Sequence, residues 1–206
     1  MSERTTRKRR INGEESRRRI LDAAAEIAGE RGYDGTTIAA VSDRCGLPAS
    51  SIYWHFADKD ELIAAVIERS FGSWLSAMEL PGAATGGVSE RLTAMAVGIA
   101  KALLESPDFL RLGLMLTLEH RPTEPSARTM FLQVRHQTRE KVVEVCHELA
   151  PQLSAAAVEQ LATYAIAGAD GLFIAKEIGG DSVDLVALFE LHAQVLVRLL
   201  AAELLA

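Results

Sequence analysis

Aromatic residues are scarce in this chain of 206 residues, of which Phe, Trp and Tyr make up 5%. The two cysteines, Cys45 and Cys146, are too far apart for a metal-ligand spacing or a disulfide framework. We therefore expect two reduced core thiols, as in a cytoplasmic protein. No apolar run is long enough to span a bilayer, and none follows the basic N-terminus, so we expect neither a membrane helix nor a signal peptide.

The sequence patterns of common enzymes are missing as well. There is no P-loop, no GxGxxG and no Ser/His/Asp arrangement, so we expect a protein that is not an enzyme and needs no cofactor. The alternation of β-branched residues that indicates strands is absent, and there is no internal repeat. Because 49% of the residues are hydrophobic, a substantial core can form, and an all-α fold is predicted.

Apolar residues recur at helical spacing along most of the chain. The first helix begins near Ile20 and ends at Gly32. Gly46 ends the second helix, Pro48 opens the third, and Asp58 caps the fourth. Longer segments complete a set of about nine helices; they are 88–105, 108–120, 126–149, 155–178 and 183–205.

The segment from Thr37 to Phe56 contains a helix, a glycine turn and a second, short helix. Ile52 and Phe56 lie one helical turn apart and are expected to point inward, which leaves the residues between them facing outward. This is the arrangement of a helix-turn-helix, whose second helix lies in the major groove of DNA. The alternative is that the outward rings form an exposed hydrophobic patch or a protein interface.

Side-chain chemistry suggests how this second helix meets DNA. Ala49 can contact a thymine methyl group, and the hydroxyls of Ser50 and Ser51 can bond to base edges. Tyr53 and His55 can reach phosphate oxygens, which fixes the register of the protein on the duplex without reading sequence.

The string TIAAVSDRCGLPASSIYWHFADKDEL, from Thr37 to Leu62, closely resembles the signature of the tetracycline-repressor (TetR) family. That signature has Thr at the helix start, Ile-Ala, Gly at the turn, Ile-Tyr-x-His-Phe, a later Lys and Glu-Leu. The resemblance covers residues 16–70 and implies a transcriptional regulator with an N-terminal three-helix DNA-binding domain. It also implies that Trp54 helps to select the operator. The DNA-facing residues that it implies are Thr37, Ser50, Ser51, Tyr53, Trp54, His55 and Lys59.

The resemblance also implies a cavity for a small inducer in the C-terminal helices. The segment 108–120 is apolar nearly all round, so it must be buried on most sides. Asp170 is a charge within an apolar run, and its alternative role is a hydrogen bond between helices. A lipophilic ligand suits such a body. The candidate ligand-binding residues are Trp74, Met95, Phe109, Leu112, Met115, Leu116, Met130, Tyr164 and Asp170.

The last two segments have too few polar residues to cover an exposed face, so they should be buried against a partner. The resemblance implies a homodimer through these helices, with two DNA-binding heads about 34–36 Å apart that bind a palindrome. We expect a repressor that a ligand releases from its operator; a ligand-independent silencer or an activator is the alternative. The expected domains are a flexible basic arm over 1–14, a DNA-binding domain over 15–60, and a ligand-binding and dimerisation domain over 61–206.

Charge is distributed unevenly along the chain. The formal net charge is −6, yet residues 1–20 carry eight Lys or Arg against three Glu. A basic end on an acidic body suggests that this end meets a polyanion. We expect the arm either to enter a minor groove of DNA or to remain a solvated tail that raises nonspecific affinity.

One helix also carries residues that could bind a metal ion, because their spacing places them on one face. Basic residues such as Arg139 crowd the same helix and favour a solvated face with ion pairs instead. We therefore expect no metal site. The residues concerned are His136, Glu140, Glu144 and His147.

Overall fold

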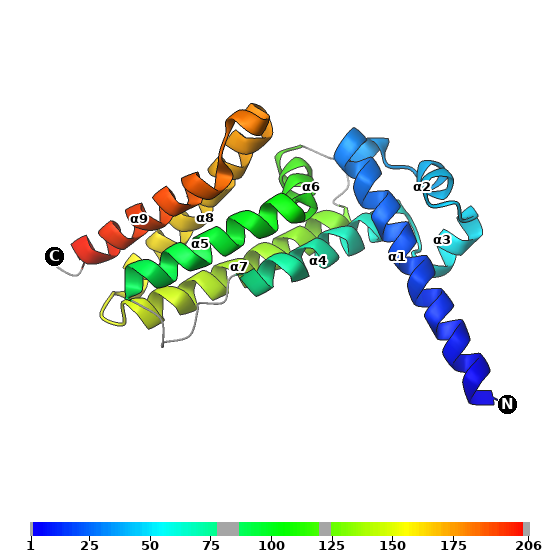
Figure 1. The fold of residues 1–206 in the computed structure, drawn as a ribbon, viewed down its shortest axis with the longest axis horizontal. Coiled ribbons are helices and arrows are strands. Elements are labelled where there is room, and N and C mark those ends of the chain that lie inside the picture. Colours follow the sequence, from blue (N-terminus) through cyan, green and yellow to red (C-terminus); the bar gives the residue numbers. More distant parts are fainter. Residues whose placement is uncertain (1, 78–86, 120–124, 204–206) are drawn as a thin grey trace. The chain divides into compact units, whose positions relative to one another are not determined.

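The structure is a computed structural model, drawn as a ribbon in Figure 1. It describes residues 2–77, 87–119 and 125–203. Within these ranges the chain forms nine α-helices, one short 3-10 helix and no strand, so the predicted all-α fold is confirmed. The chain divides into two compact units. Unit 1 comprises Met1–Ser70 and Asp108–Leu132, and unit 2 comprises Phe71–Pro107 and Gln133–Ala206.

Unit 1 contains the N-terminal helices and α6. Helix α1 is interrupted at Gly32, where φ is 69°, in agreement with the helix end predicted at this glycine. The helices of the unit are α1 (Ser2–Gly35), α2 (Ile38–Cys45), α3 (Ala49–His55), α6 (Asp108–Leu118) and the first parts of α4 (Lys59–Ala77) and α7 (Ser126–Leu149).

The core of unit 1 is built on one face of α1. Ile20, Ala24 and Ile27 recur at helical spacing and are at most 1% exposed. Figure 1 shows α2 and α3 beside α1, and both make contacts with it. The other helices complete this core with Val41, Ile52, Phe56, Leu62, Ile63, Ile67, Phe109, Leu112 and Leu116.

Helix α6 packs against α1, although the sequence analysis assigned all residues from 61 onward to a separate domain. The contact is close, because a Cβ atom at Gly32 would lie 2.8 Å from Cε of Met115. On another side, the ring of Phe131 fills the space that a Cβ atom at Gly113 would need. A helix that is apolar nearly all round needs such cover on several sides. The compact unit is therefore larger than the predicted domain, and a functional boundary at residue 60 stays a prediction.

The predicted basic arm spans 1–14, and its residues 2–14 are part of a helix in the structure instead of a separate segment. Helix α1 begins at Ser2, and the Oγ atom of Ser16 donates to the carbonyl oxygen of Asn12 at 2.8 Å. Residues 2–13 contain no proline, and Arg and Lys are good helix formers, so a helix fixed by its buried face can extend through them. The side chains of residues 2–11 lie outside those that the structure describes.

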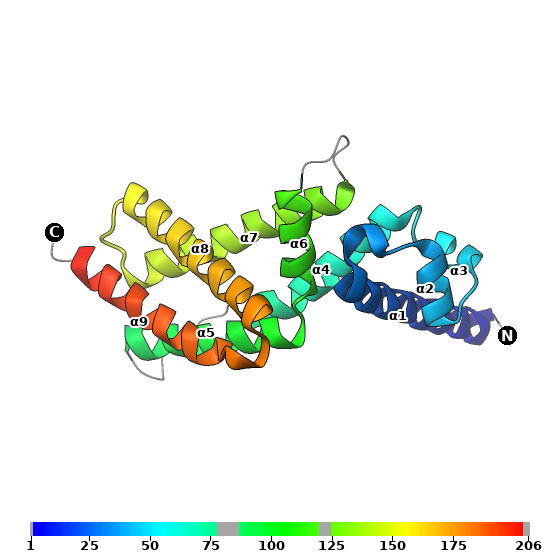
Figure 2. The same ribbon diagram turned by 90° about the horizontal axis from the view of Figure 1, so that it is seen from above.

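Unit 2 is made of α5 (Val88–Glu105), the rest of α7, α8 (Ala155–Gly179) and α9 (Leu185–Glu203). A 3-10 turn over Gly180–Ser182 joins α8 to α9, and Figure 2 shows these two helices side by side. Helix α9 also packs along α5. Their bounds follow the predicted segments closely. None of the helices in the described ranges combines the length and the hydropathy that a bilayer crossing requires.

Asp60, at the start of α4, ties three parts of unit 1 together. Its carboxylate accepts hydrogen bonds from the hydroxyl of Tyr33 at 3.0 Å and from the backbone N–H of Ala127 at 3.2 Å. The backbone N–H and the hydroxyl of Ser126 donate to it as well. Asp60 thereby caps the N-terminus of α7 from another helix, a position where a negative charge is favoured. Burial alone raises the pKa of this carboxyl, but these hydrogen bonds outweigh burial and hold the pKa below its ordinary value.

We predict that Asp60→Asn lowers the free energy of unfolding by about 1–2 kcal/mol at neutral pH, because α7 loses a charged cap. The folded-state pKa of Asp60 is depressed, so the stabilisation is present above its unfolded pKa of about 3.9 and is lost as the pH falls through the folded-state pKa. Urea unfolding at pH 7 and near pH 3 measures this difference. The exposed residue Asp43 supplies the control, Asp43→Asn. A loss for Asp60→Asn that is equally large at both pH values would contradict the prediction.

Candidate nucleic-acid interface

The turn between α2 and α3 is set by local hydrogen bonds and one glycine. Gly46 has φ of 66° and ψ of 25°, a left-handed conformation that a residue without Cβ adopts at low cost. Its N–H donates to the carbonyl of Ser42, whose own hydroxyl donates to the carbonyl of Leu47 at 2.7 Å. These contacts end α2 and direct the chain into α3, as the sequence predicted.

Helix α3 points two side chains inward and presents the others outward. Ile52 is 0% exposed and Phe56, just after the helix, is 2% exposed. On the outer side Tyr53 is 56% exposed and Trp54 is 71% exposed. The predicted division of the four rings is therefore found, with His55 half-buried between the two sets.

The residues at the start of α3 are small and accessible. Pro48 precedes the helix with an extended backbone instead of occupying its first turn, so Ala49 is the first helical residue. Ser50 is exposed, and Ala49 and Ser51 are half-buried. These side chains leave room for another molecule to approach the N-terminal end of α3 closely. That they contact DNA bases stays a prediction.

Two further predicted residues have a structural role in unit 1. Thr37 caps α2, because its side-chain oxygen accepts from the N–H of Ala40 at 3.1 Å. Lys59 donates from Nζ to the carbonyl of Tyr33 at 3.2 Å and lies 4.1 Å from the centroid of that ring. Lys59 therefore holds the end of α1 in place at the start of α4, and the phosphate contact predicted for it remains untested.

Arg17 joins this surface without having been predicted from the sequence. Its guanidinium carbon lies 5.4 Å from the centroid of the Phe56 ring, a cation–π contact between α1 and the end of α3. Burial, and secondarily the charge of Arg17, lower the pKa of His55. A signal for Arg17 existed, because it precedes Ile20 by three residues and so continues the buried stripe of α1.

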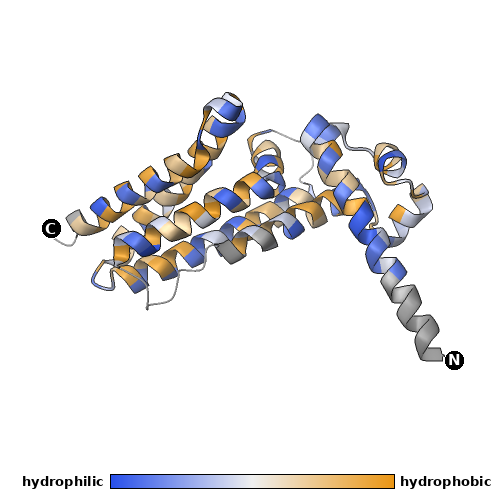
Figure 3. Cartoon of the chain, viewed as in Figure 1, coloured by the Kyte–Doolittle hydropathy of each residue, from blue (hydrophilic) through white to orange (hydrophobic). Residues whose placement is uncertain are grey.

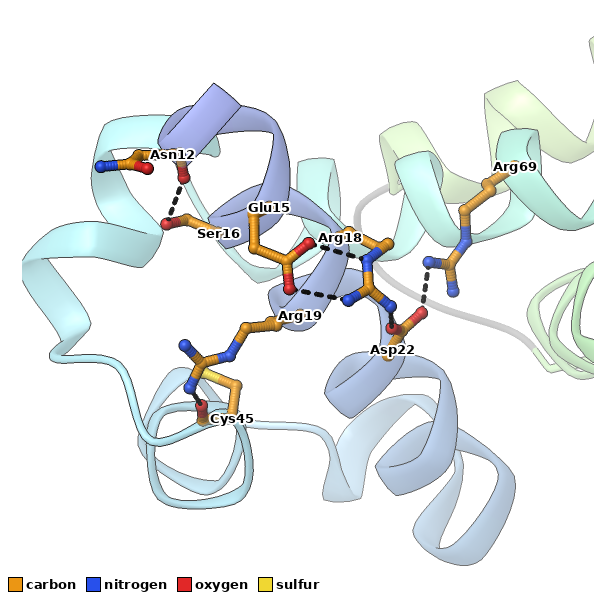
Figure 4. Close-up of polar contacts among 8 residues, drawn as sticks. All are labelled: Asn12, Glu15, Ser16, Arg18, Arg19, Asp22, Cys45 and Arg69. Atoms are coloured by element: carbon orange, nitrogen blue, oxygen red, sulfur yellow. Dashed lines mark hydrogen bonds and ion pairs between the residues drawn. The ribbon is translucent and has the colours of Figure 1, made fainter. Parts of the chain in front are cut away.

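Other polar contacts attach α1 to its neighbours. Figure 4 shows Arg18 between Glu15 and Asp22, with distances of 2.7 and 3.3 Å. Asp22 also pairs with Arg69 of α4 at 2.7 Å. In the same view Arg19 donates to the backbone carbonyl of Cys45, at the end of α2. The exposed ion pairs contribute little stability each, but the pair with Arg69 orients α1 relative to α4, and the hydrogen bond of Arg19 orients it relative to α2.

The candidate ligand-binding residues do not belong to one unit. Those in unit 2 are Trp74, which is buried, Met95, which is half-buried, Tyr164, which is 49% exposed, and Asp170. Tyr164 thus lies on the surface of unit 2, and its place in a ligand cavity stays a prediction. The candidates in unit 1 are Phe109, Leu112 and Leu116, which are buried, and Met115 and Met130, which are half-buried.

Asp170 forms an ion pair within unit 2. Arg135 of α7 donates to both of its carboxylate oxygens, at 3.0 and 2.6 Å. Burial raises the pKa of Asp170, and the charge and hydrogen bonds of Arg135 oppose that shift. The alternative role proposed from the sequence, a hydrogen bond between helices, is the one that the structure has.

The four residues considered for a metal site are spread along α7. His136 lies 3.3 Å from Glu140, and Glu144 pairs with Lys141 at 3.2 Å. In the described ranges, no three His, Cys, Asp or Glu side chains come together as metal ligands would. Cys45 and Cys146 are both buried as free thiols.

An apolar stripe lies on the outer side of α8. Tyr164, Ile174 and Ile178 are 49%, 40% and 82% exposed, and Ala167 and Gly171 continue the same face at intervals of three and four residues. On α9, Leu191 is 55% exposed. Figure 3 shows hydrophobic residues along much of α9 as well. Exposed apolar surface of this extent indicates an interface.

Sequence comparisons place the helix-turn-helix in a known family. Residues 20–66 match the family model described as bacterial regulatory proteins, tetR family. The regulator AcrR of Shigella flexneri is 33% identical over 64 residues, which are 31% of this chain and 30% of AcrR. The repressor KstR2 of Mycobacterium tuberculosis is 37% identical over 70 residues, 33% of this chain and 34% of KstR2. The match to each of these relatives therefore spans about a third of that relative's length.

Longer matches are more distant. The regulator BetI of Burkholderia mallei is 26% identical over 186 residues, which cover 90% of this chain and 93% of BetI. A transcriptional regulator of Aquifex aeolicus has the same fold, with a TM-score of 0.69 at 21% identity over 88% of this chain and 97% of that one. FadR of Bacillus subtilis, solved with stearoyl-CoA, has a TM-score of 0.71 at 18% identity over 86% and 96%. Residues 20–66 thus match the TetR family of DNA-binding transcriptional regulators, and the longer chain has the fold of regulators of that family.

Proposed function

We propose that the chain is a homodimeric repressor that binds a palindromic operator through α3 and leaves it when a small lipophilic ligand binds. The outer surface of α3 is the observation that carries this proposal. Tyr53 and Trp54 are 56% and 71% exposed there, beside the small residues that open the helix. Large rings left in water on a seven-residue helix indicate a surface that another molecule covers.

The proposed contacts divide between bases and phosphates. Ala49, Ser50 and Ser51 face the base edges in the major groove, where a methyl group or a hydroxyl can be accommodated. Tyr53 and His55 bind phosphate oxygens and fix the register. Thr37 precedes α3 in the chain and Lys59 follows it, and both contact phosphates of the DNA backbone. Trp54 lies beside these residues on the outer side of α3.

We predict that Tyr53→Phe weakens operator binding about tenfold or more, because each head loses a hydrogen bond to a charged phosphate, worth about 1.5–3 kcal/mol. The operator is first selected from a random pool of DNA duplexes, and affinities are then measured by fluorescence anisotropy at fixed salt. Ser89→Ala, which removes an exposed hydroxyl at the start of α5, is the control and should bind normally. Unchanged affinity for Tyr53→Phe would remove this residue from the interface, and a pool from which no duplex is retained would refute the DNA-binding role.

The homodimer is proposed from the outer faces of α8 and α9. Tyr164, Ile174, Ile178 and Leu191 are all at least 40% exposed within one unit. Their spacing on α8 forms a continuous stripe that a second copy of the same helices can cover. One helix-turn-helix binds DNA weakly, whereas two heads about 34–36 Å apart bind both halves of a palindrome.

We predict that Leu191→Glu converts the dimer into a monomer, because each copy would place a charge in an apolar interface without a partner. The mass in solution is measured by light scattering, and operator affinity should fall with it. Leu118→Glu is the matched control, since Leu118 is a 78% exposed leucine of α6 in unit 1. A dimer that persists in Leu191→Glu would place the interface elsewhere.

The ligand is proposed to be lipophilic because of the polar bonds already made in unit 2. Arg135 donates to both oxygens of Asp170 and balances its charge, which disfavours a cationic ligand at this carboxylate. The remaining candidates in that unit, such as Trp74 and Met95, are apolar and adaptable. The ligand must bind the DNA-free arrangement more tightly than the DNA-bound one, or operator affinity would not change.

We predict that oleate and the dye anilinonaphthalene sulfonate each bind the dimer and weaken operator binding at least tenfold. Binding of the dye is followed by its fluorescence, and release of a labelled operator is followed by anisotropy in the same titration. Glycerol, which is small and polar, serves as the control. Operator affinity that stays constant with both compounds would favour the alternative function, a ligand-independent silencer or activator.

A further inference from the structure

We propose that Trp54 positions the N-terminal turns of α1 against α3, so that the basic extension binds DNA phosphates outside the half-site as a rigid helix. The basic extension is defined as residues Ser2–Gly13 of α1. This inference rests on the proposed DNA binding by α3. Trp54 has the most exposed ring of the helix-turn-helix, and the proposed role of this ring is to contact α1 instead of bases. The basic residues of the extension are Arg4, Arg7, Lys8, Arg9 and Arg10.

The contact between α1 and the aromatic run follows two successive turns. A Cβ atom at Gly13 would lie 3.7 Å from Cη2 and Cζ3 of Trp54, which is ordinary van der Waals contact. One turn further along α1, the guanidinium of Arg17 lies over the ring of Phe56. His55 stands between these two contacts and packs edge-on against Trp54, with ring centroids 4.5 Å apart. Trp54, on the outer side of α3, and Phe56, just after it, therefore both contact α1.

The register of α1 continues this contact toward its N-terminus. Ile27, Ala24, Ile20, Arg17 and Gly13 follow one another at intervals of three and four residues, so they share one face of the helix. The first three are buried and the last two meet α3. The next position on the same face is occupied by Arg10. The helix that packs in the core thus continues, without a break, into the basic residues of the extension.

The helical state of the extension limits how it can bind DNA. An α-helix with its side chains is about 10–12 Å across, whereas the minor groove is about 6 Å wide. A helical extension therefore cannot insert into a minor groove as an unfolded arm can. It can instead lie along the outside of the duplex, where each phosphate that it neutralises adds about 0.9 to the salt dependence of binding.

The weak point of the extension is Asn12-Gly13, because glycine and asparagine are poor helix formers in a helix interior. Trp54 packs at this point. The contact supports the helix where its own propensity is lowest, and without it the basic extension would lose its fixed direction. The charges would then still attract DNA, but they would no longer meet a defined set of phosphates.

The test compares full-length variants on the selected operator with flanking duplex on both sides. The first is Trp54→Ala, and the second neutralises the extension by Arg7→Gln, Lys8→Gln, Arg9→Gln and Arg10→Gln; a third combines both. The slope of log Kd against log salt is measured for each. We expect neutralisation to lower the slope by roughly 2 or more, and Trp54→Ala to lower it in the natural chain but to have no effect in the neutralised one. An equal fall in slope after Trp54→Ala in both chains would mean that Trp54 acts independently of the basic extension and would overturn the inference.

A second pair of variants changes the helix without removing any charge or ring. Gly13→Pro interrupts α1 between the extension and Arg17, so it should reproduce the lower slope of Trp54→Ala. Gly13→Ala is the matched control and should keep or raise the slope, because a Cβ atom fits at that position. A natural chain that binds no operator would refute the proposed function. An operator-binding chain in which Gly13→Pro leaves the slope unchanged would refute only the positioning role.

Discussion

A helix of seven residues is too short to be stable alone in water, and α3 is such a helix. The burial of Ile52 and Phe56 against α1 and α2 holds it in place. Because these two side chains are one turn apart on the inner side, they also decide which residues face outward. Ser50, Tyr53 and Trp54 are accessible as a consequence of that packing, and the proposed DNA contacts depend on it. Destabilising the small core would therefore reorient the whole outer surface at once.

The helices could be predicted well from the sequence because their ends are marked locally. Gly46 adopts the left-handed conformation expected after α2, and Asp58 accepts from the N–H of Glu61 at 2.8 Å as a cap of α4. The bounds of α5 and α7 coincide with the predicted ones for the same reason, since Gly87 and Pro107 flank α5 and prolines flank α7 on both sides. Such signals depend on residues a few positions apart, so one sequence is enough to read them.

Partners that are distant in sequence could not be predicted in the same way. The charge of Asp170 was noticed, but nothing in its surroundings pointed to Arg135 of α7 as its partner. The cap that Asp60 supplies to α7 joins residues 66 positions apart. Helix α6 was predicted to be buried, yet the sequence did not say that α1 would cover it. Arg17 is an intermediate case. Helical spacing places it on the same face of α1 as Ile20, but the sequence does not identify Phe56 as its neighbour.

Thr37 illustrates how one side chain can satisfy the fold and still be free to bind. Its oxygen accepts a hydrogen bond from the N–H of Ala40. This bond uses an acceptor site of the hydroxyl, so the O–H group can still donate to another acceptor. That proton can be donated to a phosphate oxygen while the cap stays intact, so DNA would dock without any loss of helix stability. Asp would cap α2 equally well but would repel the phosphate, and Ala would do neither. Serine and asparagine share both capacities, so the position is more constrained than its exposure suggests.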